Sequence, residues 1–127
     1  MLRTRAISMI ILFKLLSCDN ARIPDCSIDP IAIHSVTSDI SVLTAYPYAY
    51  TDDPIDAYGR LELLTNGNGL CANEFYNNYA TDSLFRQERI KSWLRWFESE
   101  KCYINIEKIN DSIKNYNLEN VPDISLY

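Results

Sequence analysis

The sequence is poor in the side chains on which common hydrolases depend. It has one histidine, His34, among 127 residues, so Ser-His-Asp or Cys-His catalysis would have to use that residue. His34 lies in the apolar run IAIHSVT without a catalytic signature around it. Phosphate-loop, GxSxG and HExxH motifs are also missing from the sequence. We therefore expect a noncatalytic protein.

The cysteines are too widely spaced to predict a zinc site. Cys18, Cys26, Cys71 and Cys102 include no CxxC pair, and a single histidine accompanies them. Structural zinc sites combine four cysteine and histidine ligands, usually in closely spaced pairs. The sequence therefore predicts neither a metal site nor a cofactor.

Positive charge is scarce as well. The chain has 12 lysines and arginines against 17 acidic residues, a net charge of −5. Nucleic acids and anionic lipid surfaces attract concentrated positive charge, so neither is expected as a partner. An acidic surface suits a basic protein partner, although acidity also serves solubility alone.

The N-terminal segment MLRTRAISMIILF has the pattern of a secretory signal peptide. Arg3 and Arg5 precede an apolar stretch that is too short to cross a bilayer as a helix. We predict export, against the alternative of a buried N-terminal helix. Removal of residues 1–17 takes away Arg3, Arg5 and Lys14, leaving 9 basic residues, 17 acidic residues and a net charge of −8.

The apolar stretch ends in LLSC, residues 15–18. Leu15, Ser17 and Cys18 match the lipobox, so this segment resembles the signal peptides of bacterial lipoprotein precursors, whereas Lys14 and Leu16 depart from the pattern. The resemblance covers about the first twenty residues and implies nothing about the rest of the chain. It implies cleavage before Cys18 and acylation of Cys18. More than one acyl chain would anchor the protein stably to a membrane.

The remaining cysteines leave two outcomes open. An exported chain meets an oxidising compartment, which favours disulfides. If Cys18 is acylated, one of the other three cysteines stays unpaired or bonds to another chain. If it is not, the protein is secreted and two disulfides can use all four. The sequence does not select among the three alternative pairings; our choice is Cys71 with Cys102, which would tie a hairpin to a helix.

Residues 18–30 are predicted to form a tether and residues 31–127 a single domain, because Pro24 and Pro30 interrupt a polar stretch. In DISVLTAYPYAY, every second side chain falls on one face of a predicted strand. These side chains are Ile40, Val42, Thr44, Tyr46, Tyr48 and Tyr50. Asn66-Gly67 is typical of a type I′ turn and predicts a β-hairpin between YGRLELLT and NGLCANEF.

Helical patterns follow in the last third of the chain. One helix is predicted from an N-cap at 81–83 through Cys102, and its apolar stripe is formed by Ile90, Trp93, Leu94 and Phe97. A second, weaker helix is predicted over residues 105–117. The predicted fold is therefore α+β: a small antiparallel sheet around the Asn66-Gly67 hairpin, with one or two C-terminal helices packed on it.

Nine tyrosines and two tryptophans are the most informative feature for function. These side chains bury a large area at low entropic cost and keep a polar group, so exposed ones suit a protein interface. The alternative is that they cover the predicted sheet. The candidate binding surface consists of Tyr46, Tyr48, Tyr50 and Trp96.

The leading hypothesis is an exported, membrane-anchored, noncatalytic binding protein of the cell envelope, periplasmic or on the cell surface. By analogy with small immunity and inhibitor proteins, its partner would be another envelope or secreted protein, basic in charge. The first alternative is a small secreted hydrolase that uses His34. The second is a carbohydrate-binding module that uses exposed tyrosine and tryptophan side chains.

Overall fold

The computed structural model describes residues 26–48, 53–66, 74–120 and 123–127. In this part of the chain the regular elements are all helical, and no residue lies in a β-strand. They are α2 (Pro30–Ala45), α3 (Pro54–Asn66), the π-helix η1 (Phe75–Tyr79), α5 (Ser83–Glu100) and α6 (Ile106–Glu119). The prediction of an α+β fold with an antiparallel sheet is therefore wrong.

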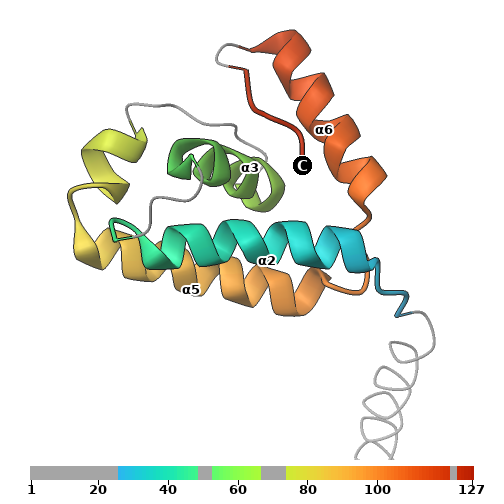
Figure 1. Ribbon diagram of the computed structural model, residues 1–127, viewed down its shortest axis with the longest axis horizontal. Helices are drawn as coiled ribbons and strands as arrows, with labels where there is room; N and C mark the ends of the chain where they lie inside the picture. The colour runs from blue at the N-terminus through green and yellow to red at the C-terminus, as the bar shows by residue number, and fades with distance from the viewer. Residues whose placement is uncertain (1–25, 49–52, 67–73, 121–122) are drawn as a thin grey trace, which may run out of the picture.

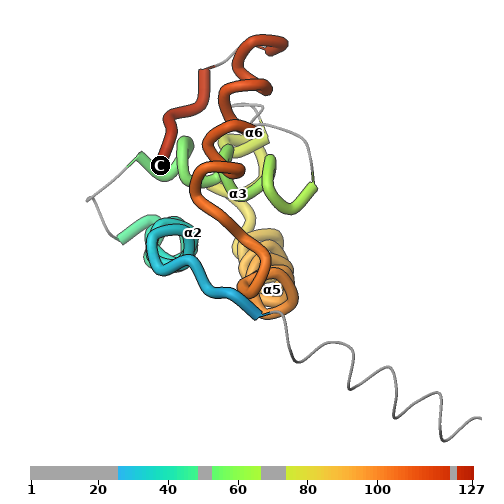
Figure 2. Tube along the Cα trace, turned by 90° about the vertical axis from the view of Figure 1, so that its right-hand side faces the viewer, coloured from blue at the N-terminus to red at the C-terminus, as the bar shows by residue number. Residues whose placement is uncertain are grey.

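Helices α2 and α5 lie side by side and run in opposite directions (Figure 1). Helices α3 and α6 both lie on one side of this pair, as the view along the pair shows (Figure 2). The short π-helix η1 lies beside the first turns of α5, at the end of the pair where α2 ends. The molecule thus has two distinct ends: one where α2 begins and α5 ends, and one where α2 ends and α5 begins.

Helix α2 begins where Asp29 caps it. The Asp29 carboxylate accepts hydrogen bonds from the backbone N–H groups of Ile31 (3.0 Å) and Ala32 (3.3 Å), and Pro30 is the first helical residue. An N-cap carboxylate satisfies N–H groups that lack helical partners, and proline brings no N–H that needs one. This Asp-Pro pair is a helix-start signal that the strand prediction overlooked.

The buried side chains of α2 recur at the helical spacing of three and four residues. They are Ala32, Val36, Ile40 and Leu43. The predicted strand face is absent, since Ile40 is buried, Val42 is half-buried and Thr44 is exposed. The hydroxyl of Thr44 donates to the Ile40 carbonyl one turn earlier, at 2.7 Å, which is how a β-branched residue with a hydroxyl fits a helix.

Helix α3 occupies the first strand of the predicted hairpin. Asp53 caps it by accepting a hydrogen bond from the N–H of Ile55 at 3.0 Å, and Pro54 is its first residue. Its inward face follows the helical pattern i, i+3, i+4, i+7, at Tyr58, Leu61, Glu62 and Thr65. The hairpin prediction is wrong for this strand, and residues 67–73 of the predicted turn and second strand lie outside the described residues.

The two C-terminal helices are confirmed. Asp82 caps α5 by accepting hydrogen bonds from the N–H groups of Leu84 and Phe85, at 3.0 and 3.1 Å. Asn105 caps α6 in the same way. In the predicted stripe of α5 only Trp93 is fully buried, while Leu94 is 47% exposed.

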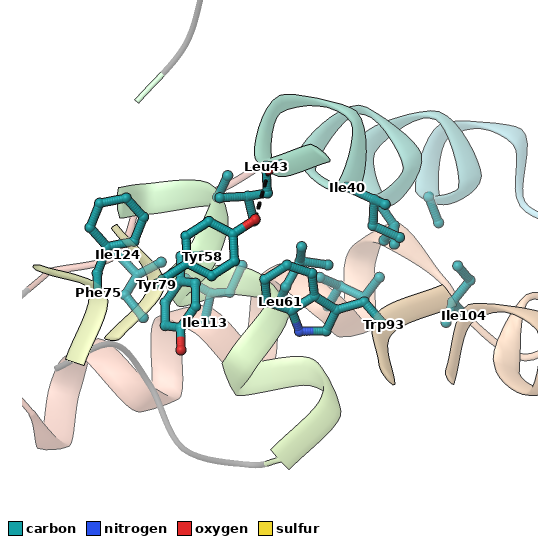
Figure 3. Packing of buried hydrophobic residues seen from close by; sticks show 14 residues of the cluster. Ile40, Leu43, Tyr58, Leu61, Phe75, Tyr79, Trp93, Ile104, Ile113 and Ile124 are labelled. Atoms are coloured by element: carbon teal, nitrogen blue, oxygen red, sulfur yellow. Dashed lines mark hydrogen bonds between the residues drawn. The ribbon is translucent and has the colours of Figure 1, made fainter. Parts of the chain in front are cut away.

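Aromatic rings fill the centre of the core (Figure 3). The largest fully buried side chains are those of Trp93, Tyr58, Tyr79 and Phe75, which come from α5, α3 and η1. The Tyr58 and Tyr79 ring centroids are 5.2 Å apart, and the Tyr58 and Trp93 centroids are 5.7 Å apart. Such edge-on and tilted ring pairs add to the stabilisation from burial alone, so this cluster holds η1 against the longer helices.

A disulfide closes one end of the molecule. It joins Cys26 to Cys102, whose Cα atoms are 4.6 Å apart and whose sequence separation is 76. The predicted pairing of Cys71 with Cys102 is therefore wrong, because Cys102 is already bonded. Cys18 and Cys71 themselves lie outside the described residues. Among the helices that the structure describes, none combines the length and apolarity needed to cross a membrane.

Candidate functional site

The structure separates the predicted surface residues. Tyr48, just after α2, is 89% exposed, whereas Tyr46 is half-buried and Tyr50 lies outside the described residues. Trp96 is half-buried on α5 and packs against the core. It lies about 20 Å along α5 from Ser83, at the helical rise per residue, and therefore does not join the tyrosines at the end of α2.

The π-helix brings another tyrosine to the end of α2. The Tyr46 ring packs edge-on against Phe75, with centroids 5.5 Å apart. The next residue, Tyr76, is 56% exposed and its ring centroid is 5.6 Å from that of Phe75. We call Tyr46, Tyr48 and Tyr76 the aromatic end. Tyr76 is not one of the surface residues predicted from the sequence.

A buried hydrogen bond fixes the base of the aromatic end. The hydroxyl of Tyr79 donates to the backbone carbonyl of Leu43 at 2.7 Å (Figure 3). Leu43 is in the last turn of α2, where carbonyl groups lack helical donors. Burial raises the pKa of Tyr79, so its hydroxyl stays protonated and able to donate. Arg86 adds a second tie, because Nη1 donates to the carbonyls of Tyr79 and Ala80, at 2.9 and 3.2 Å.

A buried carboxylate lies deeper in the same region. Glu62 is only 5% exposed. Its Oε1 accepts a hydrogen bond from Trp93 Nε1 at 3.2 Å, and its Oε2 accepts one from Asn66 Nδ2 at 2.8 Å. Arg89 Nη1 is 3.6 Å from Oε1. A buried charge with a counter-ion and two donors is satisfied, so Glu62 serves as a junction between α3 and α5.

Arg89 also connects this junction to η1. Its Nη2 is 3.6 Å from Glu74 Oε1, and the same oxygen accepts a hydrogen bond from the Tyr58 hydroxyl at 3.0 Å. Burial raises the pKa of Tyr58, and the nearby charge of Glu62 raises it further. The Tyr58 phenol is therefore a neutral donor at physiological pH. These contacts stabilise the packing of α3, η1 and α5. They are not arranged for proton transfer, because each of these polar groups already has a partner within the fold.

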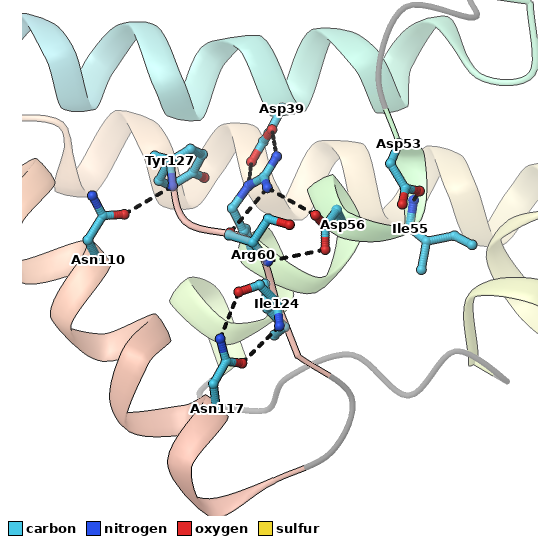
Figure 4. Close-up of polar contacts among 10 residues, drawn as sticks. Asp39, Asp53, Ile55, Asp56, Arg60, Asn110, Asn117, Ile124 and Tyr127 are labelled. Carbon is cyan, nitrogen blue, oxygen red and sulfur yellow. Dashed lines mark hydrogen bonds and ion pairs between the residues drawn. The ribbon is translucent and has the colours of Figure 1, made fainter.

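A second polar cluster is centred on Arg60 (Figure 4). Its Nε and Nη2 donate to the two oxygens of buried Asp39, at 2.8 and 2.7 Å. Nη1 donates to the Ser125 carbonyl at 3.3 Å, and the guanidinium carbon is 4.8 Å from the Tyr127 ring centroid. A bidentate arginine–carboxylate pair is strong and directional, so this cluster fastens α2, α3 and residues 123–127 to one another.

His34 is not placed for catalysis with a described carboxylate. It is exposed on α2, and among the residues that the structure describes no ion pair or hydrogen bond involves its ring. A histidine base is normally oriented by a third group. The hydrolase alternative gains no support from this geometry.

A shallow hollow of about 550 Å³ lies between α6 and the last described segment. Its lining includes Lys114, Asn117 and Leu118 from α6. Both amide atoms of Asn117 bond to the backbone of Ile124, at 2.7 and 2.9 Å. The amide of Asn117 is thus already used to hold residues 123–127 in place.

No group of three or more histidine, cysteine or acidic side chains that could hold a metal ion occurs among the described residues. Comparisons with protein-family models, with curated proteins and with solved structures found no match to this chain.

Proposed function

We propose that this protein is an exported, membrane-anchored, noncatalytic binding protein whose aromatic end contacts a basic protein partner. The observation that carries the proposal is the difference between the two ends of the domain. The Cys26–Cys102 disulfide closes one end of the α2–α5 pair, and the exposed Tyr48 and Tyr76 lie at the other end, after α2 and before α5.

The disulfide supports export. Disulfides form and persist in oxidising compartments and are rare in reducing ones. Cys26 lies only eight positions after Cys18, the residue predicted to be acylated. An anchor at Cys18 would therefore enter the domain at its disulfide end.

The aromatic end would then face away from the membrane. Helix α2 has 16 residues and so spans about 24 Å between the two ends. Tyr48 and Tyr76 would be presented to molecules in the surrounding compartment. Exposed tyrosines contribute large contact area at low entropic cost, which suits a protein interface.

Charge near the aromatic end supports a basic partner. Asp53 and Asp82, which cap α3 and α5, are exposed at this end. Arg86, the nearby cation, is turned onto backbone carbonyls and lies 6.0 Å from the centre of the Tyr46 ring. Carboxylates around an aromatic contact steer association with a positively charged surface.

Two measurements test the proposal. The intact mass of the protein from its native cells, under non-reducing conditions, is expected to show cleavage before Cys18, acylation and one disulfide. An unmodified N-terminus would contradict the anchoring. Envelope and secreted proteins captured by the wild type are then compared with those captured by Tyr48→Ala/Tyr76→Ala.

We expect the double variant to lose at least about tenfold in affinity for the captured partner, since exposed tyrosines at an interface are frequent hot spots. The control is Leu118→Ala, which removes an apolar side chain that is 86% exposed on α6 and belongs to neither the aromatic end nor the disulfide end. Binding should also weaken as salt increases. Equal capture by the double variant, or loss of capture in the control alone, would refute the role of the aromatic end.

A further inference from the structure

The disulfide end carries its own exposed apolar side chains. Ile28 is 55% exposed, Ile31 is 64% exposed and Tyr103 is 60% exposed. We call these three residues the anchor-side patch. Ile28 and Ile31 flank the start of α2, and Tyr103 directly follows Cys102. Large apolar side chains that gather at one exposed place commonly mark an interaction surface.

The fold brings the two segments of this patch together. The Cys26–Cys102 disulfide joins the two segments, and the Cα atoms of the two cysteines are 4.6 Å apart. Asp29 Oδ2 also accepts a hydrogen bond from the N–H of Ile106 at 3.0 Å. The N–H of Tyr103 donates to the Glu100 carbonyl at 2.8 Å. The patch is thus built on a cross-linked base that needs no reordering to meet a partner.

The chain itself indicates what covers the patch. Cys18 precedes Cys26 by eight residues, and a fully extended chain of that length reaches at most about 28 Å. If Cys18 is acylated, the bilayer surface is therefore always within that distance of Cys26, which lies beside the patch in sequence. Among the described exposed apolar residues, those of the aromatic end lie about one α2 length farther away, roughly 24 Å.

We propose that the anchor-side patch inserts into the interfacial layer of the bilayer to which Cys18 is anchored. This inference rests on the anchoring in the proposed function. Moving an isoleucine side chain out of water lowers the free energy. Tyrosine prefers the headgroup region because it joins an apolar ring to a polar hydroxyl. The insertion orients the domain with its aromatic end away from the membrane.

The contact is apolar rather than electrostatic. Of the cations at this end, Lys101 is paired with Glu98 at 2.9 Å, and Lys108 follows the acidic Glu107 in the first turn of α6. The chain without residues 1–17 has a net charge of −8. Anionic lipids attract clusters of unpaired basic residues, which this end does not offer in its described part. We therefore expect binding to zwitterionic lipid with little dependence on salt.

The test uses the mature chain from residue 18, with Cys18→Ser and an N-terminal hexahistidine that replaces the acyl anchor. Its probe is phosphatidylcholine vesicles that contain a nickel-chelating lipid. Hydrogen exchange of the tethered wild type should slow at residues 27–33 and 101–107 compared with the free protein. Protection confined to the aromatic end would overturn the inference.

Variants supply the second readout. Ile28→Ser/Ile31→Ser/Tyr103→Ser should raise the dissociation constant for these vesicles about tenfold or more, because three apolar side chains no longer enter the interface. The matched control is Leu84→Ser, which removes a side chain that is 71% exposed at the other end of α5. Unchanged affinity of the triple variant would overturn the inference.

Two further outcomes are decisive. A concentration-dependent dimer of the wild type that the triple variant abolishes would assign the patch to a second copy of the chain and overturn the membrane contact. The chelating tether works whether or not cells acylate Cys18. A negative vesicle result together with confirmed acylation therefore refutes the insertion alone, whereas a missing acyl group refutes the anchored function.

Discussion

Removing the Cys26–Cys102 disulfide is expected to cost this domain a large share of its stability. The bond closes a loop with a sequence separation of 76. In the chain-entropy model, a cross-link of that span restricts the unfolded chain and stabilises the fold by about 4.5 kcal/mol at 25 °C. Small domains are stable by only about 5–15 kcal/mol in total, so the loss amounts to between about a third and nine tenths of that total.

The assay is urea unfolding of two proteins that both carry Cys18→Ser and Cys71→Ser, so that disulfide exchange cannot occur. One keeps the disulfide, and the other also carries Cys26→Ala and Cys102→Ala. At a typical m-value of about 2 kcal/mol/M, the midpoint should fall by about 2 M urea. The m-value should rise, because an unfolded chain without the cross-link exposes more surface.

The outcome that would refute this reasoning is specific. If the two proteins differ by less than about 1 kcal/mol with the same m-value, the loop-closure model fails here. A loss of stability without a rise in the m-value would place the effect in the folded state instead. The helix content of the variant, measured by circular dichroism without urea, shows whether a folded state remains to be compared.

Two further predictions concern single side chains. The Asp29 pKa is lowered, chiefly by the hydrogen bond from the Ile106 N–H, so its stabilising effect is present above the unfolded pKa near 4 and is lost as the pH falls through the lower folded value. The difference in urea midpoint between wild type and Asp29→Asn should therefore shrink when unfolding is measured below about pH 4, and a constant difference would contradict this. Tyr79→Phe removes the donor to the Leu43 carbonyl and should cost about 1–2 kcal/mol in thermal unfolding. Tyr76→Phe, on the same π-helix but exposed, should cost nothing measurable; equal losses in both would show that the buried bond is not the cause.

Helices α5 and α6 could be predicted because their signals agree. Each has a capping side chain, Asp82 or Asn105, followed by apolar residues at helical spacing. In α6 the buried pair Ile109 and Ile113 lies one turn apart. Local preference and tertiary packing thus point to the same structure in this third of the chain.

The prediction of strands in the first half of the chain was wrong because a short stretch of sequence can fit both the two-residue period of a strand and the helical period. Ile40 and Val42 alternate as in a strand, yet the Asp29-Pro30 cap and the burial of Val36 and Leu43 follow the helix. Packing of an amphipathic face decides such cases, and β-branched residues do not prevent it. In α3, Asn66 ends a helix rather than opening a hairpin turn.

The candidate binding surface stays a prediction, but the positions of its residues can be compared with the structure. The exposure of Tyr48 fits the expectation of surface aromatics, but Trp96 was misplaced because its packing depends on residues distant in sequence. Tyr76 could have been found from the spacing of Phe75 and Tyr79, which places both on one helical face and leaves Tyr76 on the next. The pairing of Cys26 with Cys102 could not be predicted from the sequence, since it follows from the antiparallel arrangement of α2 and α5.

The double role of Asp29 has an electrostatic consequence for the whole disulfide end. The N-terminus of each α-helix has the effect of about half a positive elementary charge, and the starts of α2 and α6 both meet this single carboxylate. Two such half-charges amount to about one unit of positive charge, which the carboxylate balances. The charge of the two helix starts is therefore balanced when Asp29 is ionised. Protonation of Asp29 would leave the positive N-terminal ends of α2 and α6 without this balancing charge. A single protonation would therefore destabilise the starts of both helices.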